Sequence, residues 1–391
     1  MKYPYGPFQE LLMAGAHSLL PCPDDKHFEV LKDFHTSRQD WMVGHLAYDL
    51  KNQTERLSSS NRDHIGLEDM HFYIPEHIIH FDKQEVLIET YASPLHIIKV
   101  IHATQAPLEA TEPKVTSLLP NFSREQYIES VQKLKEHIVE GDIYEINFCM
   151  AYASDDALLD PLQTYLRLTD ISPTPFSVYH QFNDTYLLSA SPERFLKKTG
   201  SKLISQPIKG TAKRGESPYE DEVIKQNLRT DEKELAENMM IVDLVRNDLA
   251  KSAVIGSVKV DEMFGIYTFR QLHQMISTVS AELRPEVHFI DAIKNAFPMG
   301  SMTGAPKVKV MELIEHYERA RRNLYSGAMG YITPDGDFDF NVVIRSLLYN
   351  QATRQLSFQV GSAITYDAEP ALEYDECLLK AKAIMQVLDL L

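Results

Sequence analysis

Cysteine is scarce in this sequence, and so is any signal for export or membrane insertion. Cys22, Cys149 and Cys377 are its only cysteines, and they are too few and too widely spaced for a disulfide framework or a structural zinc site. Residues 1–7 lack the apolar core of a signal peptide, and no apolar run approaches the ~20 residues that a membrane helix needs. We therefore expect a cytoplasmic protein in a reducing compartment, without membrane attachment.

Positive charge is also in deficit. The chain has 39 Lys and Arg against 56 Asp and Glu, a formal net charge of −17. Nucleic acids and anionic membranes would be repelled, which argues against both as partners. A small anionic substrate in a locally basic pocket is still compatible with this charge. Repeats and low-complexity segments are absent, and 44% hydrophobic residues indicate an ordinary globular protein with a large core.

The chain divides near a proline-containing stretch. Residues 103–123 lose periodicity and contain three prolines, which predicts a linker between an N-terminal section, 1–112, and a second section, 113–391. Ser123, followed three positions later by Gln126, predicts a capping box that begins a helix. Within the first section, residues 51–69 are polar and predict a loop, and residues 86–91 predict a strand.

Two residues are candidates for covalent and acid chemistry. Lys209 stands between Pro207, which fixes φ, and Gly210, which allows close approach of a ligand. A lysine is a nucleophile only when its ammonium can lose a proton near neutral pH, so an ordinary solvated turn residue is the alternative. Glu193 follows Pro192 at the end of a predicted strand, where it is either an exposed turn residue or a general acid.

Two predicted helices each carry a pair of glutamates three residues apart. Glu234 and Glu237 share one face of the first helix, and Glu373 and Glu376 share one face of the last. Each pair alone would be read as a solvated helix face. Two such pairs, in a chain without His/Cys metal spacing, raise the possibility of a shared site for a hard cation such as Mg²⁺.

Two further segments have features of anion binding. Residues 297–307 combine glycines and small hydroxyl residues before a predicted helix, which suits either a carboxylate cradle or a plain tight loop. Pro334-Asp335-Gly336 predicts a hairpin turn. The returning strand is predicted to carry Arg345, whose guanidinium would pair with a structural carboxylate such as Asp339 or with a substrate carboxylate.

Six motifs, in this order, resemble those of the chorismate-utilising enzymes, and within them component I of the aminodeoxychorismate (para-aminobenzoate) synthases. They are Ser191-Pro192-Glu193-Arg194-Phe195, Pro207-Ile208-Lys209-Gly210-Thr211, residues 236–248, Thr303-Gly304-Ala305-Pro306-Lys307, Asn341-Val342-Val343-Ile344-Arg345 and Glu373-Tyr374-Asp375-Glu376. The resemblance implies one α+β fold in which two intertwined α/β halves surround a β-sandwich core. Both sections of the chain would then belong to that single fold.

The resemblance also implies an activity, the amination of chorismate to 4-amino-4-deoxychorismate in the para-aminobenzoate and folate pathway. Lys209 occupies the slot in which anthranilate synthases carry alanine, and it would attack C2 of chorismate. Glu193 matches the general acid for the departing C4 hydroxyl. Splitting one difficult displacement into two easier ones is the physical gain of the covalent route.

Binding roles follow from the same resemblance. Glu237 and Glu376 match ligands of Mg²⁺, with Glu234 and Glu373 beside them. Tyr325, Arg345 and the region of Gly361 match positions that hold the pyruvyl carboxylate of chorismate. Thr211 and Thr303 are expected to line the same pocket.

Several positions depart from the family pattern. Gln274 occupies the position at which the family usually has a histidine, and His273 lies one residue earlier. The sequence therefore leaves open which of the two faces the substrate. Glu145 stands where isochorismate and salicylate synthases carry a base lysine, which argues against those activities, and where the amination enzymes usually have glutamine. Ala363 replaces a glycine, and Met299 replaces another.

The source of ammonia is inferred from a missing motif. The chain has no Gly-x-Cys-x-Gly nucleophile setting, so we expect a separate glutamine amidotransferase as partner. Two alternatives remain, anthranilate synthase component I and a non-catalytic chorismate-binding protein. The first section also lacks the Leu-Leu-Glu-Ser stretch of tryptophan-regulated anthranilate synthases, so tryptophan inhibition is not expected.

Overall fold

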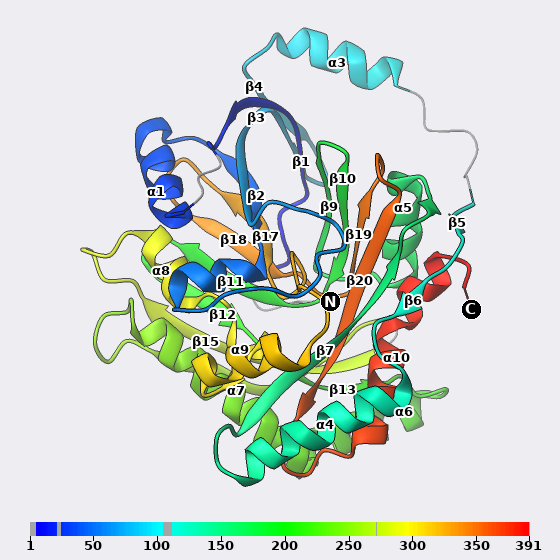
Figure 1. The fold of residues 1–391 in the computed structure, drawn as a ribbon. Helices are drawn as coiled ribbons and strands as arrows, with labels where there is room; N and C mark the ends of the chain where they lie inside the picture. The colour runs from blue at the N-terminus through cyan, green and yellow to red at the C-terminus, as the bar shows by residue number, and fades with distance from the viewer. Residues whose placement is uncertain (1–4, 22–24, 105–111, 271, 391) are drawn as a thin grey trace.

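The structure is a computed structural model that describes residues 5–21, 25–104, 112–270 and 272–390. Its larger sheet has 11 strands in the order β1-β3-β2-β17-β18-β11-β12-β15-β13, with β14 paired to β15 and β4 to β3 (Figure 1). These strands are β1 (Leu11–Leu19), β2 (Met42–Leu46), β3 (Met70–Phe81), β4 (Val86–Thr90), β11 (Arg194–Thr199), β12 (Lys202–Gln206), β13 (Ile208–Lys213), β14 (Lys259–Thr268), β15 (Leu272–Glu282), β17 (Ala328–Ile332) and β18 (Phe338–Val342).

The second sheet has seven strands in the order β16-β7-β20-β19-β10-β9, with β6 paired to β7. They are β6 (Leu119–Pro120), β7 (Glu145–Ser154), β9 (Phe176–Phe182), β10 (Thr185–Ser191), β16 (Gly304–Ala305), β19 (Ser346–Asn350) and β20 (Gln355–Ile364). Two short strands, β5 (Lys114–Val115) and β8 (Ala157–Leu158), form a separate pair.

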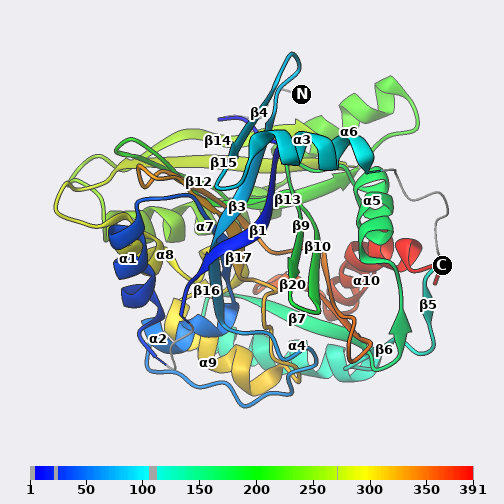
Figure 2. The ribbon, with the colours of Figure 1, turned by 90° about the horizontal axis from the view of Figure 1, so that it is seen from above.

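Helices cover the outer sides of the two sheets. Seen from above, α1 and α8 lie on one side of the molecule, and α5 and α10 lie on the opposite side (Figure 2). The helices are α1 (His27–Arg38), α2 (Lys51–Thr54), α3 (Pro94–Ala103), α4 (Arg124–Val139), α5 (Pro161–Ile171), α6 (Pro218–Thr230), α7 (Glu232–Ala250), α8 (Phe289–Ala296), α9 (Lys307–Tyr317) and α10 (Pro370–Val387), with 3-10 turns η1 (Tyr48–Leu50) and η2 (Gly300–Met302). In the described part of the chain, none of the helices combines the length and apolar character that crossing a bilayer requires.

Local sequence signals explain several of these elements. The capping box at Ser123 is confirmed, because its side chain accepts from the Gln126 N–H and the Gln126 side chain accepts from the Ser123 N–H. The hairpin turn is confirmed between β17 and β18, where Gly336 has a φ of +75°. The polar stretch 51–69 is not entirely a loop, because its first four residues form α2.

Strands from distant parts of the sequence share the larger sheet. β2 pairs antiparallel with β17 on one side and with β3 on the other, so residues near positions 42–46 lie beside residues near 328–332. Of the proline-containing stretch, residues 105–111 lie outside the described residues. Farther along that stretch, β6 pairs with β7 of the second sheet.

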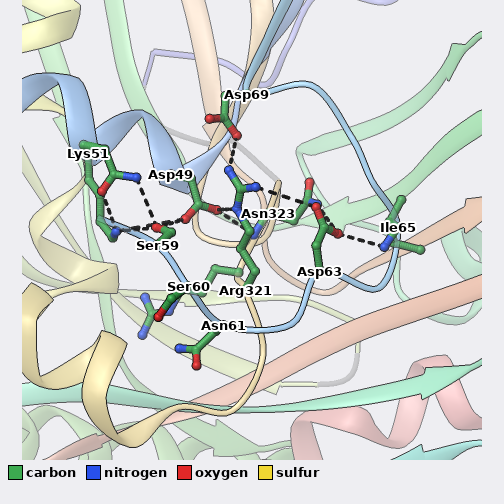
Figure 3. Close-up of polar contacts among 12 residues, drawn as sticks. Asp49, Lys51, Ser59, Ser60, Asn61, Asp63, Ile65, Asp69, Arg321 and Asn323 are labelled. Atoms are coloured by element: carbon green, nitrogen blue, oxygen red, sulfur yellow. Dashed lines mark hydrogen bonds and ion pairs between the residues drawn. The ribbon is translucent and has the colours of Figure 1, made fainter. Parts of the chain in front are cut away.

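A polar network fastens the 55–69 loop to the chain just before β17 (Figure 3). The Arg321 guanidinium lies 3.0 Å from Asp49 Oδ2, 2.7 Å from Asp69 Oδ1 and 3.8 Å from Asp63 Oδ2. Asn323 Nδ2 donates to Asp63 at 3.0 Å. The Arg321 guanidinium therefore binds three aspartates from different positions in the N-terminal segment.

Candidate active site

A cavity of about 510 Å³ opens where strands of both sheets meet helices α7 and α10. Its volume is in the range of small-molecule sites. Five carboxylates and six basic side chains line it, so the wall is close to neutral although the whole chain carries −17. These side chains are Glu193, Glu234, Glu237, Glu373, Glu376, Lys209, Lys213, Lys233, Arg345, Lys380 and Lys382.

Lys209 lies on β13 and points its amine at a buried carboxylate. Its Nζ is 2.7 Å from Oε1 of Glu145, which is the first residue of β7 and only 1% exposed. Burial lowers the pKa of Lys209, but the charges of Glu145 and Glu237 outweigh burial and hold that pKa above its ordinary value. The Lys209 side chain therefore lines the cavity, and its amine is held as an ammonium ion.

Glu193 lies between β10 and β11 with 3% of its surface exposed. Ser301 donates its hydroxyl to Glu193 Oε1 at 2.6 Å. Burial raises the pKa of Glu193 to about 7, although the Ser301 hydrogen bond and the charge of Lys209 both lower it. A carboxyl group with this pKa can give and take a proton near neutral pH, as a general acid must.

The two glutamate pairs face the same cavity from α7 and α10. Burial raises the pKa of Glu237 to about 7 and also raises the pKa of Glu234 and Glu373. Lys233 connects the helices, with its Nζ 3.3 Å from Glu373 Oε1 and 3.8 Å from Glu237 Oε1. The expectation of a shared acidic site is consistent with this placement.

The donor set suits a hard divalent cation. Mg²⁺ is usually held by one or two carboxylates together with water and substrate oxygens. Oε1 of Glu237 is buried and has no hydrogen-bond partner among the described residues. Among the described residues, no three of these four glutamates bring their oxygens within 4.8 Å of one another. A cation held by two of them would need water or substrate oxygens as further ligands.

Arg345 differs from its predicted setting. It lies between β18 and β19, with a φ of +54°, and its side chain lines the cavity. Asp339 is not its partner, because Asp339 pairs with Arg194 at 2.8 Å and with Lys197 at 3.5 Å. Among the described residues no carboxylate lies within 4.0 Å of the Arg345 guanidinium, which leaves it available to an anion.

The other predicted binding residues are placed unequally. Tyr325, Gly361 and Thr211 line the cavity. Thr303 does not belong to the lining, because it is fully buried and its hydroxyl donates to the Met299 and Gly300 carbonyls. Its place is under the cavity wall, where it holds the loop that presents Ser301.

The choice between His273 and Gln274 follows from strand alternation on β15. Gln274 lines the cavity, and its buried Oε1 has no partner among the described residues. His273 points the other way, where its ring nitrogens bond Asp221 and Thr268, each at 2.9 Å. Gln274, and not His273, therefore faces the cavity.

Four residues of the site had no assigned role from the sequence. Lys233 and Lys380 stand one helical turn from Glu237 and Glu376, so the i,i+4 spacing was the available signal. Glu145 and Ser301 gave no local signal, since their partners, Lys209 and Glu193, lie on distant segments.

Comparisons with known proteins agree with this geometry. Residues 8–386 match the family described as chorismate binding enzyme. Aminodeoxychorismate synthase component 1 of Klebsiella aerogenes is 35% identical over 353 residues, covering 89% of this chain and 77% of that protein. Anthranilate synthase component 1 of Thermus thermophilus is 33% identical over 364 residues, with the same two coverages.

A solved structure has the same architecture. Anthranilate synthase component I from Streptococcus pneumoniae superposes with a TM-score of 0.85 at 26% identity, covering 96% of this chain and 92% of that one. The expected mixed fold of helices and sheets is thereby confirmed. With the family match spanning nearly the whole sequence, the chain belongs to the chorismate-binding enzyme family.

Proposed function

We propose that this chain is component I of an aminodeoxychorismate synthase, which converts chorismate and ammonia to 4-amino-4-deoxychorismate. The observation that carries the proposal is the presence of the Lys209 amine and the Glu193 carboxyl in the wall of one cavity. Anthranilate synthases are expected to have alanine at the lysine position, and relatives with both names match this chain. The lysine is therefore the residue that favours amination at C4.

The side chains divide the reaction between them. Arg345, with Tyr325 and Gly361 beside it, binds the pyruvyl carboxylate. The Lys209 amine forms a bond to C2 while the C4 hydroxyl leaves as water, taking its proton from Glu193. Ammonia then bonds to C4 as the bond from C2 to Lys209 breaks, and the proton that ammonia loses returns to Glu193.

A divalent cation completes the site in this proposal. Glu237 and Glu376 would hold Mg²⁺, with Glu234 and Glu373 beside them, and the ion would neutralise the ring carboxylate of the dianionic substrate. The buried, unpartnered oxygen of Glu237 supports this assignment. Lys233 and Lys380 balance the same carboxylates when no cation is bound.

We propose a separate glutamine amidotransferase as the source of ammonia. Similar proteins carry the designation component 1, which is consistent with a second polypeptide. Free ammonium would serve as a poorer substitute. The cytoplasm and the folate pathway are the expected setting, since chorismate amination precedes para-aminobenzoate in that route.

Product identification tests the proposal. The purified chain is incubated with chorismate, Mg²⁺ and ammonium, and the products are separated by chromatography and identified by mass spectrometry. We expect 4-amino-4-deoxychorismate from the wild type, none from Lys209→Ala, and an unchanged yield from Lys225→Ala, which changes a partly exposed lysine of α6 outside the cavity lining. Anthranilate as the wild-type product would establish the neighbouring activity instead, and tight chorismate binding without turnover would indicate a non-catalytic protein.

A further inference from the structure

We propose that Glu145 is a catalytic residue that removes the proton from Lys209 before the amine attacks the substrate. This inference rests on the proposed function, because it assigns a role to the partner of the nucleophile. It answers a difficulty that the geometry raises. The neighbours of Lys209 stabilise its charged form, yet only the neutral amine has a lone pair to form a bond.

The position of Glu145 is rigid. Its strand partner is Ala305 of β16, and the adjacent Gly304 packs so closely that a Cβ there would lie 2.1 Å from the Glu145 carbonyl oxygen. Lys209 is fixed from the other side, since Asn238 donates its side-chain amide to the Lys209 carbonyl at 3.2 Å. The 2.7 Å contact therefore joins two well-held backbones, one in each sheet.

Glu145 has the capacity to take a proton. Oε1 of Glu145 pairs with the Lys209 ammonium, whereas Oε2 is buried and has no hydrogen-bond partner among the described residues. The contact is short enough for direct transfer without an intervening water.

Other acidic side chains surround the Lys209–Glu145 pair. Their charges determine how the protonation of Lys209 responds to pH. The groups facing Lys209 are Glu145 from β7, Glu234 and Glu237 from α7, Glu376 from α10 and Glu193 from the β10–β11 junction. All are acidic, so each one that becomes neutral weakens the hold on the ammonium. Among the described carboxylates, only that of Glu145 lies within 4.0 Å of the Lys209 Nζ.

The proton balance is simple. One N–H bond of Lys209 breaks and one O–H bond forms on Glu145, so the pair as a whole neither gains nor loses a proton. The amine then forms its bond to the substrate, and when that bond later breaks the amine recovers the proton from Glu145. Because solvent takes no part, the rate of this step is independent of pH while the pair retains one proton.

A first experiment measures the lysine without any turnover. Trace acetylation of the intact protein with acetic anhydride across pH 7–12, followed by peptide mass spectrometry, gives the titration midpoint of Lys209. We expect Glu145→Gln to lower that midpoint by about one pH unit or more relative to the wild type, and Glu140→Gln on the exposed surface to leave it unchanged. An equal midpoint in wild type and Glu145→Gln overturns the coupling.

A second experiment measures the step itself. With saturating chorismate, Mg²⁺ and ammonium, we expect Glu145→Gln, which introduces the glutamine that the amination enzymes usually carry here, to lower kcat at pH 7 and to recover about tenfold per pH unit as solvent takes over deprotonation. Glu145→Asp, which keeps the carboxylate, should lower kcat without acquiring this slope, and it carries the test if Glu145→Gln does not fold. If kcat rises with pH no more steeply in Glu145→Gln than in the wild type, Glu145 does not remove the proton from Lys209.

The two measurements separate this inference from the proposed function. If the wild type makes no 4-amino-4-deoxychorismate but Glu145→Gln shifts the acetylation midpoint, the activity assignment fails while the coupling stands. If the product forms and neither the midpoint nor the slope changes, Glu145 has no part in proton transfer.

Discussion

At the scale of single residues, burial sets the chemistry of the cavity. Glu193 and Glu237 both reach a pKa of about 7 because their charged forms lose hydration. Lys209 is also buried, but neighbouring carboxylates reverse the direction of its shift. At neutral pH Lys209 is therefore an ammonium ion, whereas Glu193 and Glu237 are partly protonated.

Ser301 is expected to tune Glu193. Its hydrogen bond lowers the pKa of Glu193, so Ser301→Ala should raise that pKa. Activity that needs protonated Glu193 should then fall at a higher pH than in the wild type, and loss of one orienting hydrogen bond should reduce kcat about fivefold. The pH profile of kcat measures both effects.

Ser357→Ala is a matched control for Ser301→Ala, because it removes another buried hydroxyl, on β20. Its profile should follow the wild type. An alkaline limb of Ser301→Ala that stays in place or moves to lower pH would contradict the proposed tuning.

The sequence allowed a prediction of those cavity residues that belong to a recognisable motif. Lys209, Glu193 and the four glutamates were all found by pattern, and all line the cavity. Their partners were not, because Glu145 lies on β7 of the other sheet and Ser301 lies in a loop between α8 and α9. The spacing of residues along the sequence does not predict such long-range contacts.

At the scale of elements, α7 and α10 form one acidic wall held together by a lysine. Lys233 reaches from α7 to Glu373 of α10, and its side chain is 44% exposed. The ammonium therefore occupies the neighbourhood where a cation would bind, and it can turn towards solvent. Cation binding and this ion pair compete for the same carboxylates.

Lys233→Met should consequently tighten divalent-cation binding. Removing one positive charge about 4 Å from the carboxylates should lower the Kd for Mg²⁺ about fivefold, measured by calorimetry or by Mn²⁺ titration followed by electron paramagnetic resonance. Lys225→Met on α6 provides the control. Unchanged or weaker binding in Lys233→Met would show that the lysine does not compete.

Strand β20 requires a glycine at position 361, where it pairs with Cys149 of β7. A Cβ on Gly361 would lie 2.5 Å from Cys149 Sγ and 2.8 Å from the Phe148 carbonyl oxygen. Gly361→Ala should destabilise the protein by about 1–3 kcal/mol through overpacking, seen as a lower midpoint in urea unfolding. Adding Cys149→Ala removes the nearer atom and should restore part of the loss; no recovery would place the clash at the backbone alone.

Elements with strong local signals were predictable, and those set by tertiary context were less so. The capped start of α4 and the proline start of α10 follow from local rules. The short helix α2 inside a polar stretch has no such signal, and Arg345 was assigned to a strand that ends three residues earlier. Arg345 also has a positive φ at the β18–β19 connection, a conformation that a non-glycine residue rarely adopts and that local spacing does not predict.

At the scale of the whole molecule, three buried histidines lie between the two sheets. His45 and His71 are opposite one another on β2 and β3, and the His180 ring on β9 lies 6.0 Å from that of His45. Burial lowers the pKa of His45 and His71 to about 4 and that of His180 to about 3. At neutral pH all three are therefore uncharged in the folded protein.

This cluster predicts acid sensitivity. The unfolded chain, with ordinary histidine pKa values, binds more protons than the folded one below pH 6.5, so the stabilisation present above pH 6.5 is lost as the pH falls towards 4. Each lowered pKa unit corresponds to about 1.4 kcal/mol. Urea unfolding at pH 7.5 and 5.0 should show a smaller decrease for His180→Phe than for the wild type.

His96→Phe, on the exposed surface of α3, is the control for His180→Phe. It should lose as much stability on acidification as the wild type does. Equal losses in all three proteins would mean that the buried cluster does not govern acid unfolding.

The architecture as a whole was accessible only through the family resemblance. Composition and periodicity gave neither the neighbours of β17 nor the meeting of the two sheets at the cavity, because such pairings join residues near 42–46 to residues near 328–332. Once the family pattern was recognised, the mixed fold followed. The departures from that pattern, such as Glu145 and Gln274, acquired meaning only from their positions in space.

The Arg321 network has a consequence for how this sequence can vary. One guanidinium is shared by Asp49, Asp63 and Asp69, so the effect of replacing any one aspartate depends on whether the other two are still present. Their substitutions are therefore expected to be epistatic. Over evolutionary time these four positions should change together or not at all, although they are scattered over more than two hundred residues.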